Sequence, residues 1–133
     1  MILNTKFVRH FQRVTRFLQI NFLEGAVGAD GRFATQRGTT LGVLLDDSAT
    51  NAIGLRPERI NLTHQSLSGE GSLPVTISSS VYKGSTLEVR AVTDNGEVLL
   101  CHVQNNARAH VHPSVPGARA FATFTKNDCV FFN

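Results

Sequence analysis

The chain has 133 residues, of which 41% are hydrophobic and 17% are charged. This length fits one ordinary domain, and this composition excludes a disordered chain and favours a globular one with a sizeable core. The net charge is +3, but four bases, Lys6, Arg9, Arg13 and Arg16, precede the first acid. Residues 21–133 therefore carry nine bases against ten acids, a balance that argues against nucleic acid as a partner because such binding needs a basic surface.

Residues 5–18 are predicted to form an amphipathic helix, within an N-terminal segment 1–20 that precedes a β domain 21–133. The helical spacing is carried by Leu3, Phe7, Phe11, Val14 and Leu18. The bases interrupt the apolar residues, so no secretory signal is expected, and no segment reaches membrane-spanning length. These features predict a cytoplasmic protein.

After residue 20 the pattern changes from helical spacing to short strands separated by Gly, Asn, Asp and Pro. The expected strands are 22–27, 32–36, 40–45, 51–55, 73–81, 86–92, 97–103, 119–125 and 129–132. Arg59–Leu62 is expected to continue strand 51–55 beyond Pro57. Polar connections are expected at 64–72 and 104–117. Strands this short and this closely spaced predict an antiparallel barrel or sandwich.

Alternation assigns faces to the three clearest strands. We expect Val75, Ile77 and Val81 to point one way. The next two strands place Leu87, Val89 and Ala91, and then Leu99, Cys101 and Val103, on shared faces. Cys101 and Cys129 are expected to be buried free thiols of a reducing compartment.

No motif for catalysis stands out in the sequence. The chain lacks a Gly-x-x-x-x-Gly-Lys-Ser/Thr phosphate loop, a Gly-x-Ser-x-Gly elbow and a His-Glu-x-x-His pair. Leu67–Gly71 is similar to the signature motif of ABC ATPases, but that chemistry also needs the phosphate loop, so we interpret it as a coincidental loop. The sequence therefore predicts a protein that is not an enzyme and needs no cofactor.

Three histidines form a weak candidate for a metal site. His110 and His112 share a face if their segment is extended, and His102 lies a strand away. Three imidazole nitrogens can hold Zn²⁺. No carboxylate or thiol lies at a suitable spacing, so solvated loop histidines are the favoured interpretation and no metal is predicted.

Two segments resemble the region that follows the ATPase in importer-type ABC transporter ATP-binding proteins. They are Asn21-Phe22-Leu23-Glu24-Gly25 and Ile53-Gly54-Leu55-Arg56-Pro57-Glu58-Arg59-Ile60. The hairpin Tyr82–Thr86 and the ending Lys126–Phe132 agree in layout. The chain is similar to the family's C-terminal TOBE domain, a transport-associated OB-like domain, over roughly residues 6–132.

The resemblance implies a small OB-like antiparallel barrel that acts as the regulatory and dimerisation domain of an importer's ATP-binding subunit, here without the ATPase. The polyamine, ferric-iron, sulfate and sugar importers are the most similar subgroup. The resemblance implies a homodimer or an ATPase subunit as partner, and a place at the inner membrane only through the transporter. We expect Arg56, Glu58 and the edges of the 51–62 and 73–82 strands to make those contacts.

Two other functions remain open. The domain can be a stand-alone sensor that binds a small ligand, either an oxyanion or a metal, because some members of the family bind molybdate. It can also be a module of the OB type that binds single-stranded nucleic acid on its aromatic residues. Phe121, Phe124, Phe131 and Phe132 are candidates, but alternation places at least half of them in the core, and few bases accompany them.

Overall fold

Short strands make up most of the described structure. The computed structural model describes residues 2–3, 20–63, 72–104 and 116–133. The strands are β1 (Ile2–Leu3), β2 (Asn21–Val27), β3 (Arg32–Thr35), β4 (Thr40–Leu44), β5 (Ala52–Leu55), β6 (Asn61–Thr63), β7 (Ser72–Lys83), β8 (Thr86–Thr93), β9 (Val98–Gln104), β10 (Arg119–Thr123) and β11 (Cys129–Phe132). Two 3-10 turns, η1 (Pro57–Arg59) and η2 (Lys126–Asp128), complete the described elements.

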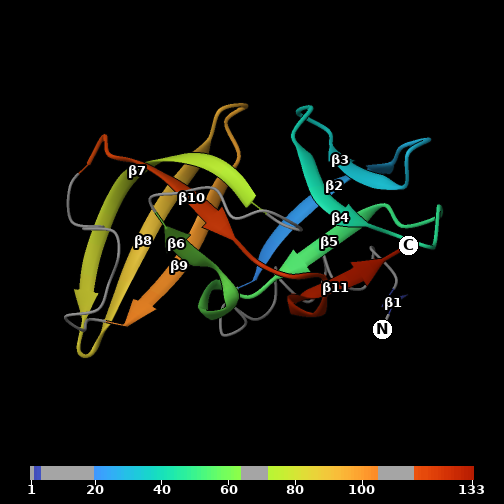
Figure 1. The fold of residues 1–133 in the computed structure, drawn as a ribbon. Helices are drawn as coiled ribbons and strands as arrows, with labels where there is room; N and C mark the ends of the chain where they lie inside the picture. The colour runs from blue at the N-terminus through green and yellow to red at the C-terminus, as the bar shows by residue number, and fades with distance from the viewer. Residues whose placement is uncertain (1, 4–19, 64–71, 105–115) are drawn as a thin grey trace.

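The strands form two sheets that lie side by side (Figure 1). The first has the order β1-β11-β5-β2-β3-β4, and the second has the order β6-β10-β7-β8-β9. All described pairs are antiparallel except β1 with β11. The fold is thus mostly β and OB-like, as predicted.

The chain crosses between the sheets at the two 3-10 turns. β5 belongs to the first sheet, and η1 carries the chain to β6 in the second. Pro57 begins η1, where its missing N–H costs nothing and its fixed φ suits the turn. η2 returns the chain from β10 to β11, and a capping box between Thr125 and Asp128 closes it. The Arg-Pro-Glu segment therefore has an architectural role, because it moves the chain from one sheet to the other.

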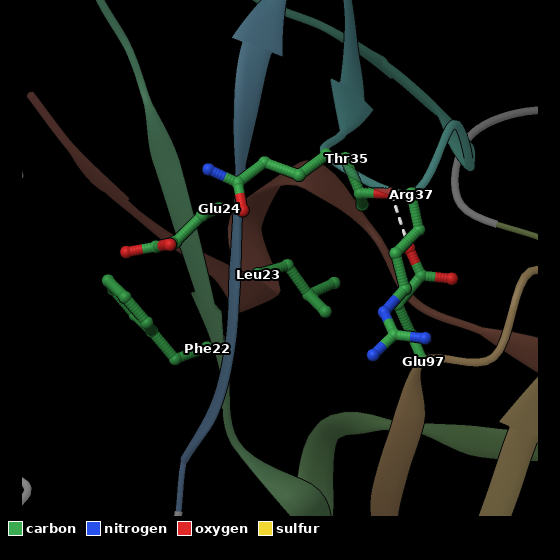
Figure 2. A pocket seen from close by; sticks show the side chains of 7 residues that line it. Phe22, Leu23, Glu24, Thr35, Arg37 and Glu97 are labelled. Atoms are coloured by element: carbon green, nitrogen blue, oxygen red, sulfur yellow. Dashed lines mark hydrogen bonds between the residues drawn. The ribbon is translucent and has the colours of Figure 1, made fainter.

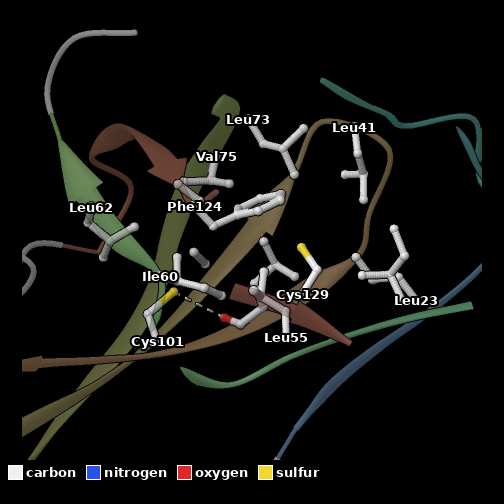
Figure 3. Packing of buried hydrophobic residues seen from close by; sticks show 14 of the residues in the cluster. Leu23, Leu41, Leu55, Ile60, Leu62, Leu73, Val75, Cys101, Phe124 and Cys129 are labelled. Carbon is white, nitrogen blue, oxygen red and sulfur yellow. Dashed lines mark hydrogen bonds between the residues drawn. The ribbon is translucent and has the colours of Figure 1, made fainter. Parts of the chain in front are cut away.

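One hydrophobic core joins the two sheets (Figure 3). It takes alternate residues from β7, β8 and β9, among them Val75, Val89 and Leu99, which are fully buried. β5 is buried along its whole length. Both cysteines are free and buried, as predicted. The core also contains Phe124, and Phe132 is buried in a smaller adjoining cluster, so two of the four C-terminal phenylalanines are fully committed to packing.

β2 has two partners, and a glycine allows the change between them. Its first half pairs with β5, and from Gly25 onward it pairs with β3. A Cβ on Gly25 would lie 2.0 Å from the backbone oxygen of Ala34. Only glycine allows β3 to approach this closely, which explains the last residue of the Asn21–Gly25 segment.

Most expected strands are confirmed, with boundaries that differ by a few residues, but two details were wrong. The segment after Pro57 does not continue β5, because β6 pairs with β10 in the other sheet. Val81 does not share the face of Val75 and Ile77. The pairing with β8 shifts by one residue between Ile77 and Ser79, and this bulge reverses the alternation beyond it, so Val81 is 54% exposed.

The structure corrects the first residues of the predicted N-terminal segment 1–20, where Leu3 was assigned to the helical pattern. Ile2–Leu3 of the predicted N-terminal segment form a strand beside β11. The predicted helix 5–18 lies outside the described residues, as do most of the predicted connections at 64–72 and 104–117. No described helix is long and apolar enough to cross a membrane.

Candidate functional site

Asn21 connects the two sheets through hydrogen bonds of its side chain. It is the first residue of β2 and is 7% exposed. Its side-chain amide donates to the carbonyl oxygens of Leu100, at 2.9 Å, and Leu55, at 3.1 Å. Its side-chain oxygen accepts the backbone N–H of Leu100 at 2.7 Å. The asparagine therefore replaces a strand partner for the edge of β9 and connects it to the first sheet.

A buried carboxylate makes a second connection between the sheets. Glu97 lies after the β8–β9 turn and is 8% exposed. Its side chain accepts hydrogen bonds from the hydroxyls of Thr35, Thr39 and Thr93, the second at 2.5 Å. Thr35 and Thr39 belong to the β3–β4 hairpin, so the carboxylate joins the turns of two hairpins from different sheets. We call Thr35, Thr39, Thr93 and Glu97 the threonine–glutamate cluster.

The cluster holds its charge without a described cationic partner. Burial alone raises the pKa of Glu97, but the donors outweigh it, and the net pKa lies below the ordinary value. Those donors are the three hydroxyls and the backbone N–H of Glu97 itself. Hydrogen bonds to the ionised form thus keep the buried carboxylate charged at neutral pH.

An open pocket of about 260 Å³ lies beside the cluster (Figure 2). Its lining includes Thr35 and Glu97 from the cluster, and the exposed Arg37. The remaining lining residues are Phe22, Leu23, Glu24 and Gln36. Arg37 lies against Gly96, where a Cβ would approach its guanidinium to 2.9 Å. The mixture of one base and two acids fits neither a simple anion site nor a simple cation site.

A second pocket, of about 200 Å³, is lined by residues of the same two turns and by the start of β7, and most of its lining side chains are small and polar. It is lined by Gly38, Thr39, Thr40, Ser72, Leu73, Pro74, Thr93, Asp94 and Asn95. Asp94 is the acid in this lining, and Arg119 donates to it at 2.8 Å. That hydrogen bond and the guanidinium charge lower the pKa of Asp94. The hydroxyls of Thr39 and Thr93 already donate to Glu97, and the Asn95 amide donates to Thr39 at 3.0 Å. A small polar ligand in this pocket would therefore rely on other lining groups, among them the hydroxyl of Thr40.

The predicted contact residues Arg56 and Glu58 lie where a partner can reach them. Both are exposed on either side of buried Pro57, at the crossing between the sheets. None of the ion pairs between described residues joins one to the other. The two charges therefore project from a backbone that is fixed by its proline, and their role in contact stays a prediction.

Of the three candidate histidines, His102 lies among the described residues. His102 pairs with Glu88 across β8 and β9, and its Nε2 atom lies 3.9 Å from the Glu88 carboxylate. That nitrogen is buried and has no hydrogen-bond partner. Glu88 is already bound by Lys83 at 2.8 Å, and this contact lowers the pKa of Glu88. No group of three metal-binding side chains occurs among the described residues, and His110 and His112 lie outside them.

Sequence reasoning missed the roles of Asn21 and Glu97. In the sequence, Asn21 belongs to the family segment and Glu97 begins a predicted strand, and neither pattern predicts a connection between two sheets. A signal existed for Glu97, since it follows the Asp94-Asn95-Gly96 turn and opens an apolar strand, where a charged residue needs partners. Nothing local indicated those partners, because two of its three hydroxyl donors come from residues 58 and 62 positions away.

The two sheets, joined by the Asn21 contacts and the threonine–glutamate cluster, define a small OB-like β domain. The family model of the TOBE domain matches residues 53–132, which is more than half of the chain. The chain therefore belongs to the TOBE domain family, as the Arg56–Ile60 segment and the strand layout indicated.

Similar solved structures include ModG, described as a cytoplasmic molybdate-binding protein, in a crystal form with molybdate bound. The TM-score is 0.65 at 16% sequence identity, and the match covers 85% of this chain and 94% of that chain. At this identity the likeness shows the fold alone. A search of curated proteins found no match.

Proposed function

We propose that this chain is the non-hydrolytic regulatory domain of an importer-type ABC transporter ATP-binding subunit. In this role it pairs subunits and passes signals between them, on the cytoplasmic side of the membrane. The TOBE match over residues 53–132 is the observation that carries the proposal. The exposed charges of Arg56 and Glu58 support it, because the crossing between sheets presents them on a rigid turn.

The first test identifies the partner. An antibody to this domain is used on its source cells, and the protein that carries or accompanies it is sized and sequenced by mass spectrometry. We expect an ATP-binding polypeptide with a phosphate loop, either in the same chain and well above 14.5 kDa or as a bound partner. Recovery of the 14.5 kDa chain alone would contradict the proposal.

The second test uses Arg56→Glu in the same complex. We expect it to weaken subunit pairing by about tenfold or more, as loss of a contact charge does at the centre of an interface. Arg90→Glu is the control, since Arg90 is also exposed but lies on β8, away from the crossing. Equal effects of the two reversals would remove Arg56 from the interface. Hydrolysis of ATP by the purified chain would contradict the non-hydrolytic role.

A second candidate function is binding of a small oxyanion, and one observation favours it. The hydroxyl- and amide-lined pocket of about 200 Å³ lies in a fold shared with ModG, whose crystal structure contains molybdate. Thr40 lines that pocket and is not part of the threonine–glutamate cluster, so its hydroxyl can bind a ligand without breaking the contacts of that cluster.

Thermal unfolding with molybdate, sulfate, phosphate, iron or zinc tests this candidate. A ligand present at 100 times its Kd stabilises the fold by about 2.7 kcal/mol, which is a clear rise in Tm. We expect an oxyanion to raise Tm and Thr40→Val to reduce the rise, whereas Thr86→Val on the β7–β8 hairpin leaves it unchanged. A rise with zinc or iron alone would favour a metal sensor, and no rise would exclude both.

A further inference from the structure

The turn between β8 and β9 contains a pair of residues that is chemically unstable in water. Asn95-Gly96 is the single Asn-Gly pair in the chain. Asparagine is thermolabile, and it deamidates fastest before glycine, because glycine has no Cβ to hinder attack by its backbone nitrogen. Asn95 is exposed, so water can reach its side chain. The turn therefore brings together the groups that deamidation needs.

Two hydrogen bonds restrain the groups that would react. The side-chain amide of Asn95 donates to Oγ1 of Thr39 at 3.0 Å, which directs it towards the β3–β4 hairpin. The backbone N–H of Gly96 donates to the carbonyl oxygen of Thr93 at 3.0 Å. Deamidation needs the Gly96 nitrogen without its proton, and it needs that nitrogen against the amide carbon of Asn95. Both hydrogen bonds must therefore open before the reaction can begin.

We propose that Asn95 is a modification site, at which opening of the turn allows the Gly96 nitrogen to attack the amide carbon of Asn95. A bond forms between these two atoms, and the bond from the amide carbon to Nδ2 breaks. Ammonia leaves and carries away the proton of the Gly96 nitrogen. Water then opens the cyclic succinimide at either carbonyl, which gives aspartate or isoaspartate. Water is the only other reactant, so the step needs no oxidant, reductant or cofactor.

Either product changes the contact between the sheets. Thr39 has one hydroxyl hydrogen and already donates it to Glu97 at 2.5 Å. A carboxylate at position 95 has no hydrogen to donate, so it would face the Thr39 oxygen without a hydrogen bond. It would also lie two positions from the charged Glu97, and like charges repel. Isoaspartate in addition inserts one carbon into the backbone of the turn. The modification thus weakens the connection that the threonine–glutamate cluster makes.

The new charge also enters the pocket of about 200 Å³, because Asn95 belongs to its lining. Asp94 already contributes a carboxylate there, and Arg119 is bound to it at 2.8 Å. The modification makes this lining more acidic, whichever partner the domain has. It goes beyond the proposed function and does not depend on it.

Timed incubation of the folded full chain at mildly alkaline pH, followed by trypsin and mass spectrometry, tests the proposal. Cleavage after Arg90 and Arg108 releases the peptide 91–108. Fragment ions then show whether the gain in mass, from replacement of NH₂ by OH, lies at Asn95. We expect conversion at Asn95 in the folded chain, at a rate at least about tenfold below that of the chain in urea, because the hydrogen bonds must open first.

Thr39→Val tests the restraint on the turn. It removes the acceptor of the Asn95 amide, and conversion should become about three- to tenfold faster, the factor that one lost hydrogen bond gives. Asn21→Ala is the matched control, because it weakens the other connection between the sheets and leaves these contacts in place. No conversion in the folded chain, equal rates in the folded and unfolded chains, or equal acceleration by both variants would each overturn the proposal.

Asn95→Asp reproduces one product and tests the consequence for the fold. We expect its equilibrium constant of unfolding in urea to rise by about tenfold, since it loses a hydrogen bond and gains a repulsion. Asn61→Asp adds the same charge at the exposed start of β6 and should leave that constant nearly unchanged. Far-UV circular dichroism verifies that both variants fold. The same stability for Asn95→Asp and the wild type would overturn the proposed effect on the contact between the sheets.

Discussion

Two polar side chains decide how the sheets meet, although the bulk of the contact between the sheets is apolar. Asn21 is bound to the backbone of β9 and β5, and Glu97 is bound to hydroxyls of two hairpins. Burial of unpaired polar groups is costly, so these contacts fix one relative position of the sheets and penalise others. Glu97 lines the first pocket, and its partners Thr39 and Thr93 line the second, so its contacts affect the shape of any ligand site there.

Asn21→Ala should destabilise the fold by about 1–3 kcal/mol, because it leaves the N–H and carbonyl of Leu100 without these partners. Urea unfolding followed by circular dichroism measures the change. Asn61→Ala is the control, since Asn61 is exposed at the start of β6, and a change within about 0.5 kcal/mol is expected. Equal losses for both variants would show that Asn21 does not join the sheets.

Glu97 gives stability a defined dependence on pH. Its pKa in the folded state lies below its ordinary value of 4.5, so the unfolded chain takes up the proton first as the pH falls. Its contribution is therefore complete above the unfolded pKa and is lost as the pH falls through the folded pKa. Tm of the wild type should decrease more steeply than Tm of Glu97→Gln from about pH 5 towards pH 3.

Other carboxylates with lowered pKa values, among them Glu88 and Asp94, are present in both proteins and cancel in that comparison. The difference in Tm between wild type and variant thus isolates Glu97. Parallel curves across this pH range would mean that the carboxylate is no better stabilised in the fold than in the unfolded chain. The same experiment in high salt should change little, because the partners are hydroxyls rather than exposed charges.

At the scale of elements, the β7 bulge separates two halves of one strand. Before it, Ile77 is 1% exposed, and after it Val81 is 54% exposed. Ile77→Ala should cost about 2–5 kcal/mol of unfolding free energy, and Val81→Ala no more than about 0.5 kcal/mol. Denaturant unfolding at a concentration where the chain is monomeric measures both. Similar costs would contradict the bulge and restore the regular alternation that the sequence predicted.

The sequence predicted the strands well because each strand is short, alternates and is bounded by turn residues. It could not predict the bulge, because the extra residue, Ser78, lies in a run of three serines that carries no alternation signal. The crossing after Pro57 was missed for a related reason. A proline marks the end of a strand but does not tell which sheet receives the next one, and here β6 joins β10, which lies far along the chain.

The candidate site was predictable only in part. The exposure of Arg56 and Glu58 follows from their places on either side of a buried proline, and the resemblance drew attention to them. The threonine–glutamate cluster joins residues from two hairpins that are far apart in the sequence, so no local sequence pattern predicts it. Asn21 and Gly25 both belong to the family segment, but the sequence does not explain why these residue types occur there. Asn21 binds the backbone of β9, and Gly25 allows a close approach of Ala34, and both contacts appear only in the folded structure.

At the scale of the whole molecule, the two sheets share one core, so they should unfold together. Cys101 is a reporter for this behaviour, since it is fully buried on β9 at the centre of that core. Burial raises the pKa of its thiol to about 12, so the native protein offers almost no thiolate to an alkylating reagent at neutral pH. Reaction of Cys101 therefore requires an opening of the core.

We expect alkylation of Cys101 to proceed through global unfolding, with an opening free energy that agrees within about 1 kcal/mol with the value from circular dichroism. Mass spectrometry after timed exposure to iodoacetamide measures it in a Cys129→Ser background. In the wild type, Cys129 is 9% exposed at the start of β11 and should react sooner, through fraying of that strand. Alkylation of Cys101 at a much lower free energy would mean that β9 separates from the first sheet while the rest stays folded. In that case the Asn21 and Glu97 contacts would act as a hinge between the sheets.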